Sequence, residues 1–167
     1  MSVILSMQNS LLEMEKSSTQ NSAKYRRWFN LNADMFKEVD FIQSKIMAKQ
    51  IDAEIKRCYA NCVRAVIRNR KLRYYEGYTT TIGIPIEHAF LVDENDQVID
   101  PTLAIDSKIA TKQSKTLYGV ECNIETKRIG SEYYGIEIPR SDLMKVITKK
   151  EANYLGLAFL YWEMKFK

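Results

Sequence analysis

The chain has 167 residues, a length that suits one domain, or one domain with an appendage, around a single core. With 46% hydrophobic and 28% charged residues it has the composition of a soluble globular protein, and its net charge of +4 permits a nucleic-acid partner without naming one. The apolar run Val3-Ile4-Leu5 is too short for a signal-peptide core and no run is long enough to cross a bilayer, so we expect no membrane partner and a cytoplasmic location.

Cysteine usage indicates reduced thiols rather than a disulfide framework. The chain contains Cys58, Cys62 and Cys122, an odd number in a sequence that shows no export signal. We expect all three to be free thiols.

Helical patterns dominate the first part of the chain. Neither glycine nor proline occurs in the first 73 residues, and apolar residues recur there at helical spacing. The polar segment 17–22 is rich in residues that cap helices, and it predicts a break before a helix that begins near Ala23. Asn30-Leu31-Asn32 indicates a second break.

One predicted helix carries two of the cysteines. Apolar residues stand three and four positions apart through Ile51, Ile55, Cys58, Tyr59, Cys62, Val63, Val66 and Ile67. This spacing predicts a buried face that includes Cys58 and Cys62. No glycine or proline interrupts the pattern, and a helix that ran unbroken from about Met47 to Arg68 would hold Cys58 in its middle, away from the helix dipole's positive end.

The later part of the chain is rich in aromatic and β-branched residues, as strands are. Segments 74–81, 90–92, 98–99, 117–120 and 133–138 are predicted strands, and the second and third of them are predicted to form a hairpin. Ser141 or Asp142 is expected to cap a closing helical region that runs through Trp162.

This order of elements, helices followed by an antiparallel sheet and then a helix, predicts an α+β domain. We divide the chain into a helical N-terminal region or cap over residues 1–46 and a core over residues 47–167. The helical N-terminal half is expected to pack on the small sheet.

The only histidine in the chain, His88, stands at the start of the predicted hairpin, and Asp100 follows on its second arm. If the loop is Asp93-Glu94-Asn95, with Asn95 in a left-handed conformation, His88 faces Asp100 directly at a Cβ separation of about 5 Å. A carboxylate in that place can hold an imidazole N–H and stabilise the imidazolium. An odd loop length is the condition, because an even one would put the two side chains on opposite faces.

A thiol presented by a helix on this sheet would complete a nucleophilic site, and Cys58 and Cys62 are the candidates. A nearby imidazole or the positive end of a helix favours the thiolate, which is the nucleophile. The backbone N–H of the nucleophile commonly contributes to an oxyanion hole.

Four motifs in this order resemble the transglutaminase-like, papain-like superfamily of cysteine enzymes, including uncharacterised phage and bacterial members. They are Cys58-Tyr59-Ala60-Asn61, Tyr75-Glu76-Gly77-Tyr78, Pro85-Ile86-Glu87-His88-Ala89-Phe90-Leu91 and Val98-Ile99-Asp100-Pro101-Thr102. The resemblance implies Cys58 as nucleophile, His88 as base and Asp100 as orienter. It further implies Asn61, Tyr59 and Glu76 as supporting residues and a papain-like core.

These residues lead us to expect an acyl-transfer enzyme that works through a Cys58 thioester. Its substrate would be a protein, a peptide or a small amide, and hydrolysis and transfer share the thioester, so peptidase, amidase, deamidase and transglutaminase activities stay open. No cofactor or metal is implied, and the oligomeric state is not addressed.

Other uses of these residues compete with this interpretation. Cys62 and Cys122 are expected to be small buried hydrophobic side chains. Cys58, Cys62, His88 and Asp100 could together hold zinc, although Cys-x3-Cys lacks the tight spacing of structural zinc sites. The alternative function is an inactive binding module of the same fold, for phage–host interaction or for nucleic acid, that uses the basic strip Arg64, Arg68, Arg70, Lys71 and Arg73.

Overall fold

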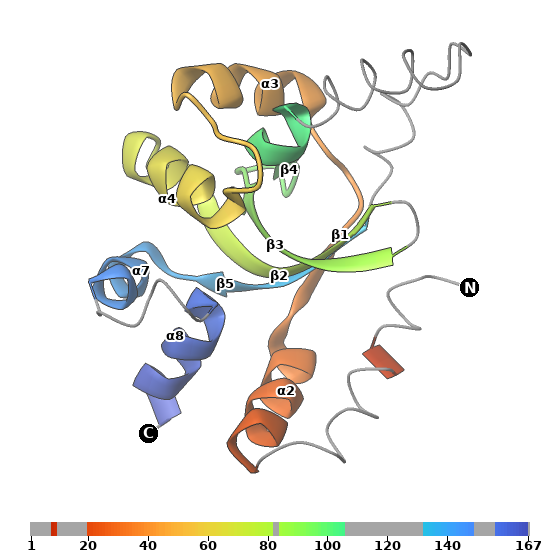
Figure 1. Ribbon diagram of the computed structural model, residues 1–167, viewed down its shortest axis with the longest axis vertical. Coiled ribbons are helices and arrows are strands. Elements are labelled where there is room, and N and C mark those ends of the chain that lie inside the picture. Colours follow the sequence, from red (N-terminus) through yellow and green to blue (C-terminus); the bar gives the residue numbers. More distant parts are fainter. Residues whose placement is uncertain (1–7, 10–19, 82–83, 106–131, 149–155, 167) are drawn as a thin grey trace.

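The computed structural model describes residues 8–9, 20–81, 84–105, 132–148 and 156–166 (Figure 1). Its centre is an antiparallel sheet in the order β1-β5-β2-β3-β4. The strands are β1 (Asp34–Phe36), β2 (Arg73–Thr81), β3 (Ile84–Val92), β4 (Val98–Ile99) and β5 (Tyr133–Ile138). The helices are α2 (Gln20–Asn32), α3 (Phe41–Gln50), α4 (Cys58–Arg68), α7 (Arg140–Ile147) and α8 (Leu157–Phe166). The molecule is therefore a mixed helix and sheet protein with a closing helix, as the sequence predicts.

The main core lies between one face of the sheet and the helices α3, α4, α7 and α8. Tyr74 on β2 and Leu91 on β3 are fully buried against Val66 of α4, Leu143 of α7 and Leu160 of α8. Burying this apolar surface is the main force that holds the helices on the sheet.

The opposite face of the sheet buries aromatic rings. Successive strand residues point to opposite faces, so Tyr75 and Phe90 leave the main core and stack on each other at a ring-centroid distance of 5.5 Å. Phe36 of β1 and Tyr133 of β5 belong to the same cluster, together with Val92 and Val98. His88 follows the same alternation two residues before Phe90, and it therefore lies on this face.

The unbroken helix considered for the segment from about Met47 to Arg68 does not form, because two helices occupy this segment. α3 ends at Gln50 and α4 begins at Cys58. Asp52 and Lys56 adopt positive φ angles of 51° and 61°, a left-handed conformation that breaks the helix without glycine. The residues of the predicted apolar face therefore do not lie on one helix. Ile51 is buried at the end of α3, whereas Ile55 lies in the loop between the helices and is 38% exposed.

The expected hairpin loop is also wrong. Val92 pairs with Val98, so the loop has the five residues 93–97 instead of three, and Asp96 rather than Asn95 takes the left-handed conformation. The side chain of Asp93 accepts hydrogen bonds from the backbone N–H groups of Asn95 and Gln97, which stabilises the longer loop. Five is also an odd number, so His88 and Asp100 still share a face although they are not directly opposed.

The N-terminal region contains more than helices. β1 lies within it and pairs with β5, and the domain boundary placed after residue 46 falls inside α3. The predicted break at Asn30-Leu31-Asn32 is confirmed, because α2 ends at Asn32.

The predicted strand 133–138 is confirmed as β5, whereas the predicted strand 117–120 lies outside the described residues. Neither Ser141 nor Asp142 caps the helix that follows. α7 has Pro139 at its N-terminal cap, and the Asp142 carboxylate instead forms ion pairs with Lys145 and Lys165. Within the described part of the chain, no helix is both long enough and apolar enough to cross a membrane.

Candidate active site

Cys58 is the first residue of α4, at the positive end of its helix dipole. Its side chain is 9% exposed, and the residue before it, Arg57, makes no side-chain hydrogen bond to the first turn of the helix. The break between α3 and α4 therefore puts this thiol at a helix start instead of mid-helix, next to amide groups that the Arg57 side chain does not cap.

Cys62 lies one helical turn further on and is fully buried. Its thiol donates a hydrogen bond to the carbonyl oxygen of Ala89 on β3, with a distance of 3.3 Å between sulfur and oxygen. Burial and the nearby charge of Asp100 raise the pKa of this thiol well above its usual value. Cys62 is thus held as a neutral thiol that fixes α4 across β3, next to His88, while Cys122 lies outside the described residues.

His88 contacts both of the residues expected to work with it. Its Nε2 atom lies 2.7 Å from Oδ2 of Asp100 and is hydrogen-bonded to it, and both side chains are almost wholly buried. The Cys58 thiol lies close enough to the imidazole to raise the pKa of His88. Since Nε2 is taken by Asp100, Nδ1 is the ring nitrogen available to sulfur.

The electrostatics of this contact favour a charged imidazole. Burial alone would lower the pKa of His88, but the charge of Asp100 and the hydrogen bond with it outweigh burial, and Cys58 adds to their effect. The net result raises the pKa of His88 to about 10. At neutral pH the site therefore holds an imidazolium between the Asp100 carboxylate and the sulfur of Cys58.

Asp100 is fixed on all sides before it meets the imidazole. One carboxylate oxygen, Oδ1, accepts hydrogen bonds from the backbone N–H groups of Thr102 and Leu103, each at 3.0 Å, and so caps the short helix 101–105. Oδ2 accepts from the Tyr133 hydroxyl at 3.1 Å as well as from His88. Asp100 therefore does two things at once: Oδ1 caps the short helix that begins at Pro101, and Oδ2 binds the imidazole of His88.

Asn61 joins the segments on either side of the site. Its side-chain amide donates to the carbonyl oxygen of Glu54 at 2.7 Å and to Oγ1 of Thr102 at 2.9 Å. Its carbonyl oxygen accepts from the Glu54 backbone N–H at 3.0 Å and from Arg64 at 2.7 Å. Asn61 is fully buried and ties the loop before Cys58 to the turn after Asp100.

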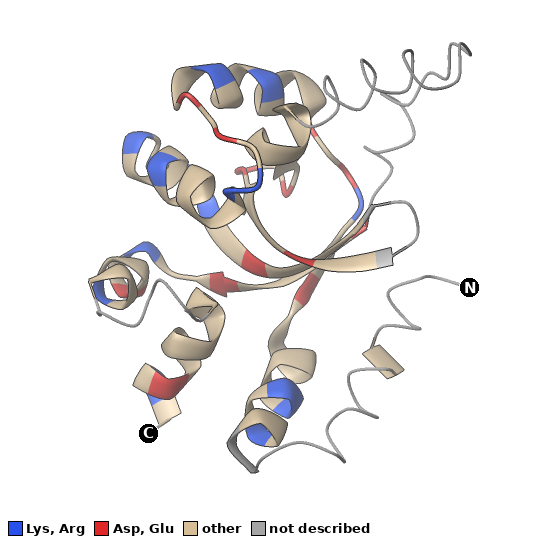
Figure 2. Cartoon of the chain, in the orientation of Figure 1, with Lys and Arg blue, Asp and Glu red and all other residues tan. Residues whose placement is uncertain are grey.

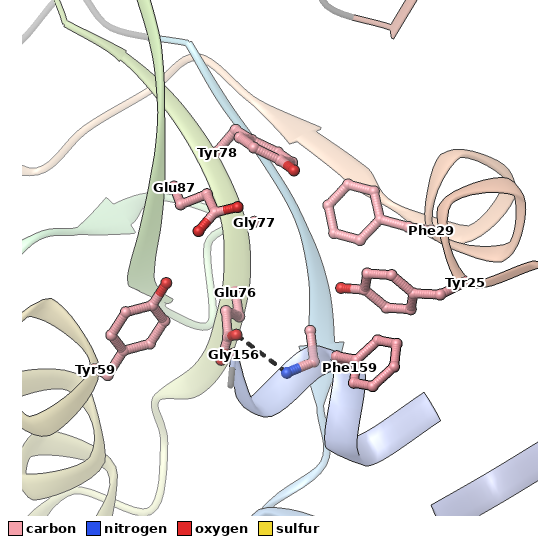
Figure 3. A pocket seen from close by; sticks show the side chains of 10 residues that line it. Tyr25, Phe29, Tyr59, Glu76, Gly77, Tyr78, Glu87, Gly156 and Phe159 are labelled. Atoms are coloured by element: carbon pink, nitrogen blue, oxygen red, sulfur yellow. Dashed lines mark hydrogen bonds between the residues drawn. The ribbon is translucent and has the colours of Figure 1, made fainter. Parts of the chain in front are cut away.

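The other two expected supporting residues, Tyr59 and Glu76, line a neighbouring pocket (Figure 3). Burial raises the pKa of the Glu76 carboxyl to about 7, although hydrogen bonds from the Ala158 backbone and from the Tyr74 hydroxyl lower it in part. Burial also raises the pKa of Tyr59. Cys58, His88 and Asp100 are not among the residues that line this pocket.

Sequence reasoning missed two groups that hold Asp100. The Ser44 hydroxyl of α3 accepts a hydrogen bond from the Asp100 backbone N–H at 2.9 Å, and Tyr133 binds its carboxylate. Both come from distant parts of the chain, and no local motif identifies them. Among the described residues, no group of three or more histidine, cysteine, aspartate or glutamate side chains is arranged to hold a metal ion.

The basic strip proposed for nucleic acid is largely paired with acidic groups. Arg64 contacts Glu54, Lys71 contacts Glu94 and Arg73 contacts Asp96. Arg68 donates to the carbonyl oxygen of Gln50. Comparison of the chain with protein-family models, with curated proteins and with solved structures found no match.

Proposed function

We propose that this protein is a thiol-dependent acyl-transfer enzyme of the papain-like, transglutaminase-like kind, with Cys58 as nucleophile, His88 as acid and base and Asp100 as orienter. The contact series from the Cys58 thiol through the His88 imidazole to the Asp100 carboxylate carries the proposal. A cysteine, the chain's only histidine and an aspartate, drawn from three separate elements, meet in a buried site at the start of a helix.

In the first step, the Cys58 thiolate attacks the carbonyl carbon of an amide or ester and forms the carbon–sulfur bond. The imidazolium of His88 gives its Nδ1 proton to the leaving amine or alcohol as that carbon–nitrogen or carbon–oxygen bond breaks. Asp100 holds the ring through Nε2 and stabilises its charge before the transfer.

The carbonyl oxygen becomes negatively charged in the tetrahedral intermediate, and the first turn of α4 stabilises that negative charge. The N–H groups at a helix start have no partner within the helix, and here the side chain of the N-cap residue Arg57 does not cap them. These N–H groups together with the helix dipole form an oxyanion hole beside the nucleophile.

In the second step, neutral His88 takes a proton from water or from an amine, whose oxygen or nitrogen then attacks the thioester carbon. The carbon–sulfur bond breaks, and the Cys58 thiolate and the His88 imidazolium are restored. Hydrolysis and transfer differ only in this second nucleophile.

Trapping of the acyl-enzyme tests the proposal. Wild-type protein treated briefly with p-nitrophenyl acetate near pH 7 should carry one acetyl group, which peptide mass spectrometry should locate on Cys58. Cys62→Ala should be acetylated as fast as the wild type, whereas Cys58→Ala should lose the adduct and His88→Ala should slow its formation by about 100-fold. Acetylation at Cys62, or equal rates for native and urea-unfolded protein, would exclude Cys58 as an activated nucleophile.

The binding-module alternative has less support, because the basic strip on which it depends is mostly paired with acidic and carbonyl groups. A fluorescein-labelled single-stranded oligonucleotide that bound with strong salt dependence, in a protein whose thiols are unreactive, would reverse this preference.

A further inference from the structure

A pocket with a cavity volume of about 120 Å³ opens on the main-core face of the sheet, next to the candidate active site. Five elements build it: the first turn of α4, the strands β2 and β3, the helix α2 and the start of α8 (Figure 3). Five aromatic rings form most of its wall, and they belong to Tyr25, Phe29, Tyr59, Tyr78 and Phe159.

Several polar side-chain groups face this cavity. No described residue forms a hydrogen bond or ion pair with the hydroxyls of Tyr25, Tyr59 and Tyr78 or with the carboxylate of Glu87. Figure 3 shows these groups directed into the space between the rings. Glu87 is exposed, so its carboxylate is available from solvent. A pocket lined this way offers several hydrogen-bond acceptors and one free negative charge.

The remaining charges around the pocket also favour a cation. No lysine or arginine of the described part of the chain lines it, and Glu76 is a second acidic side chain within it. The Glu76 carboxylate accepts a hydrogen bond from the Ala158 backbone N–H, so an anion could not bind at this start of α8. Burial raises the pKa of the Tyr78 hydroxyl, and the negative charge of Glu87 raises it further. The positive charge of Arg26, a residue of α2 outside the lining, lowers it in part. In Figure 2, aspartate and glutamate residues lie on the strands at the centre of the molecule, whereas lysine and arginine residues lie on α2, α3 and α4.

We propose that this pocket binds a positively charged side chain of the substrate, an alkylammonium or guanidinium group of the kind that lysine and arginine carry. Aromatic rings attract a cation over their faces, and a carboxylate adds an ion pair and fixes its orientation. The cavity has room for such a head group and little more, which suits recognition of one side chain within a longer peptide or amide.

The position of the pocket connects it to the chemistry of the site, and this connection rests on the proposed function. Tyr59 directly follows Cys58 on α4, and Glu87 directly precedes His88 on β3. Because strand neighbours point to opposite faces, β3 presents the proposed base on one side and the cation-binding carboxylate on the other. A basic residue held by Glu87 would place a carbonyl of the same substrate chain within a residue or two of the thiol.

Binding of small model compounds tests the proposal without any turnover. In Cys58→Ala protein, Nα-acetyl-lysine amide and Nα-acetyl-arginine amide should shift the NMR signals of residues around Tyr59 and Glu87. Nα-acetyl-norleucine amide, a neutral analogue of lysine, should bind at least about tenfold more weakly, which corresponds to the loss of one charge-assisted contact. Equal affinity for the neutral and the charged amides would overturn the proposal.

Glu87→Gln should weaken binding of the charged amides by about tenfold and leave binding of the neutral amide unchanged. Glu94→Gln is the matched control, because Glu94 is an exposed carboxylate that pairs with Lys71 and does not line the pocket. If Glu87→Gln binds the charged amides as the wild type does, the pocket does not recognise cations.

The two proposals fail separately. Cation binding without acetylation of Cys58 would contradict the enzyme and keep the pocket, while acetylation of Cys58 with no preference for charged amides would contradict the pocket and keep the enzyme.

Discussion

The two ring nitrogens of His88 face different residues, so the imidazole lies between the Asp100 carboxylate and the Cys58 sulfur. Nε2 is fixed by Asp100 at 2.7 Å, so the ring can turn only slightly, and Nδ1 is left for the sulfur of Cys58. Asp100 in turn receives hydrogen bonds from two backbone N–H groups and from Tyr133. An orienting residue that is itself immobile holds the imidazole in one place, which a near-attack geometry requires.

The titration of His88 can be measured directly, because the chain has no other histidine. Its ring signals in ¹H–¹⁵N correlation spectra should remain those of an imidazolium at pH 8, since its pKa is raised to about 10. Asp100→Asn removes the charge that raises the pKa, and the midpoint should fall by at least about two pH units. Tyr133→Phe, which keeps the carboxylate, is the control and should change the midpoint much less.

The same pKa shift sets the sign of a stability effect. Folded His88 binds its proton more tightly than unfolded His88, whose pKa is near 6.5. Its contribution to the free energy of unfolding is therefore complete below pH 6.5 and is lost as the pH rises toward 10.

At the scale of elements, the site depends on the break between α3 and α4 as much as on the triad residues. The break frees the first turn of α4 and puts Cys58 at its start. Asn61 holds the broken segment through both atoms of its amide group, on Glu54, and reaches Thr102 on the other side of the site. We therefore expect Asn61 to position both Cys58 and Asp100.

Replacement of Asn61 tests this role. Asn61→Ala leaves the Thr102 hydroxyl and the backbone of Glu54 without their partners, and we expect a loss of about 2 to 4 kcal/mol in the free energy of unfolding by urea. Alkylation of Cys58 in the folded variant should also slow. Asn69→Ala is the matched control at the other end of α4, where a single exposed hydrogen bond to Lys71 is lost, and it should cost less than about 1 kcal/mol. Similar losses in the two variants would mean that Asn61 has no special place in the site.

The sequence predicts the elements better than their junctions. His88 and Asp100 share a face of the sheet whenever the hairpin loop has an odd number of residues. Loops of three and of five residues both meet this condition, so this part of the site is predictable. The true register depends on the turn formed by Asp93, which a strand pattern does not contain. The helix break depends on Asp52 and Lys56 in a conformation that residues other than glycine seldom adopt, so a search for glycine or proline cannot find it.

At the scale of the whole molecule, Glu76 connects the sheet to the last helix. It extends from β2, and its carboxylate accepts hydrogen bonds from the Ala158 backbone N–H on α8 and from the Tyr74 hydroxyl. Gly156 lies against this carboxylate so closely that a Cβ atom there would stand 2.5 Å from Oε1 of Glu76. The last helix and the sheet therefore meet at one buried ionisable group, next to the proposed cation pocket.

This junction should make the stability of the protein depend on pH. Burial raises the pKa of Glu76 to about 7 from an ordinary value of 4.5, so the contribution of its carboxyl is complete below pH 4.5 and declines as the pH rises to 7. The shift corresponds to a destabilisation on the order of 3 kcal/mol at pH 8. Glu76→Gln should remove this decline, and urea unfolding at pH 4.5 and pH 8 measures it, with Glu94→Gln as the exposed control. An unchanged pH dependence in Glu76→Gln would show that Glu76 is not the responsible group.

The long-range contacts were beyond prediction for a reason that applies to the whole fold. Tyr133 and Ser44 reach Asp100 from β5 and α3, and their places follow from how the sheet and the helices close around the site. No periodicity in the sequence specifies which distant side chains meet in space.

The pH dependence of alkylation of Cys58 by iodoacetamide, with mass spectrometry to locate the modified cysteine, tests the central claim most directly. A thiolate paired with the His88 imidazolium should react at pH 6 at least about tenfold faster than the same cysteine in urea-unfolded protein, and His88→Ala and Asp100→Ala should lose this advantage. Slow alkylation at pH 6, with a pH profile that neither substitution changes, would contradict the claim that Cys58, His88 and Asp100 form an active site.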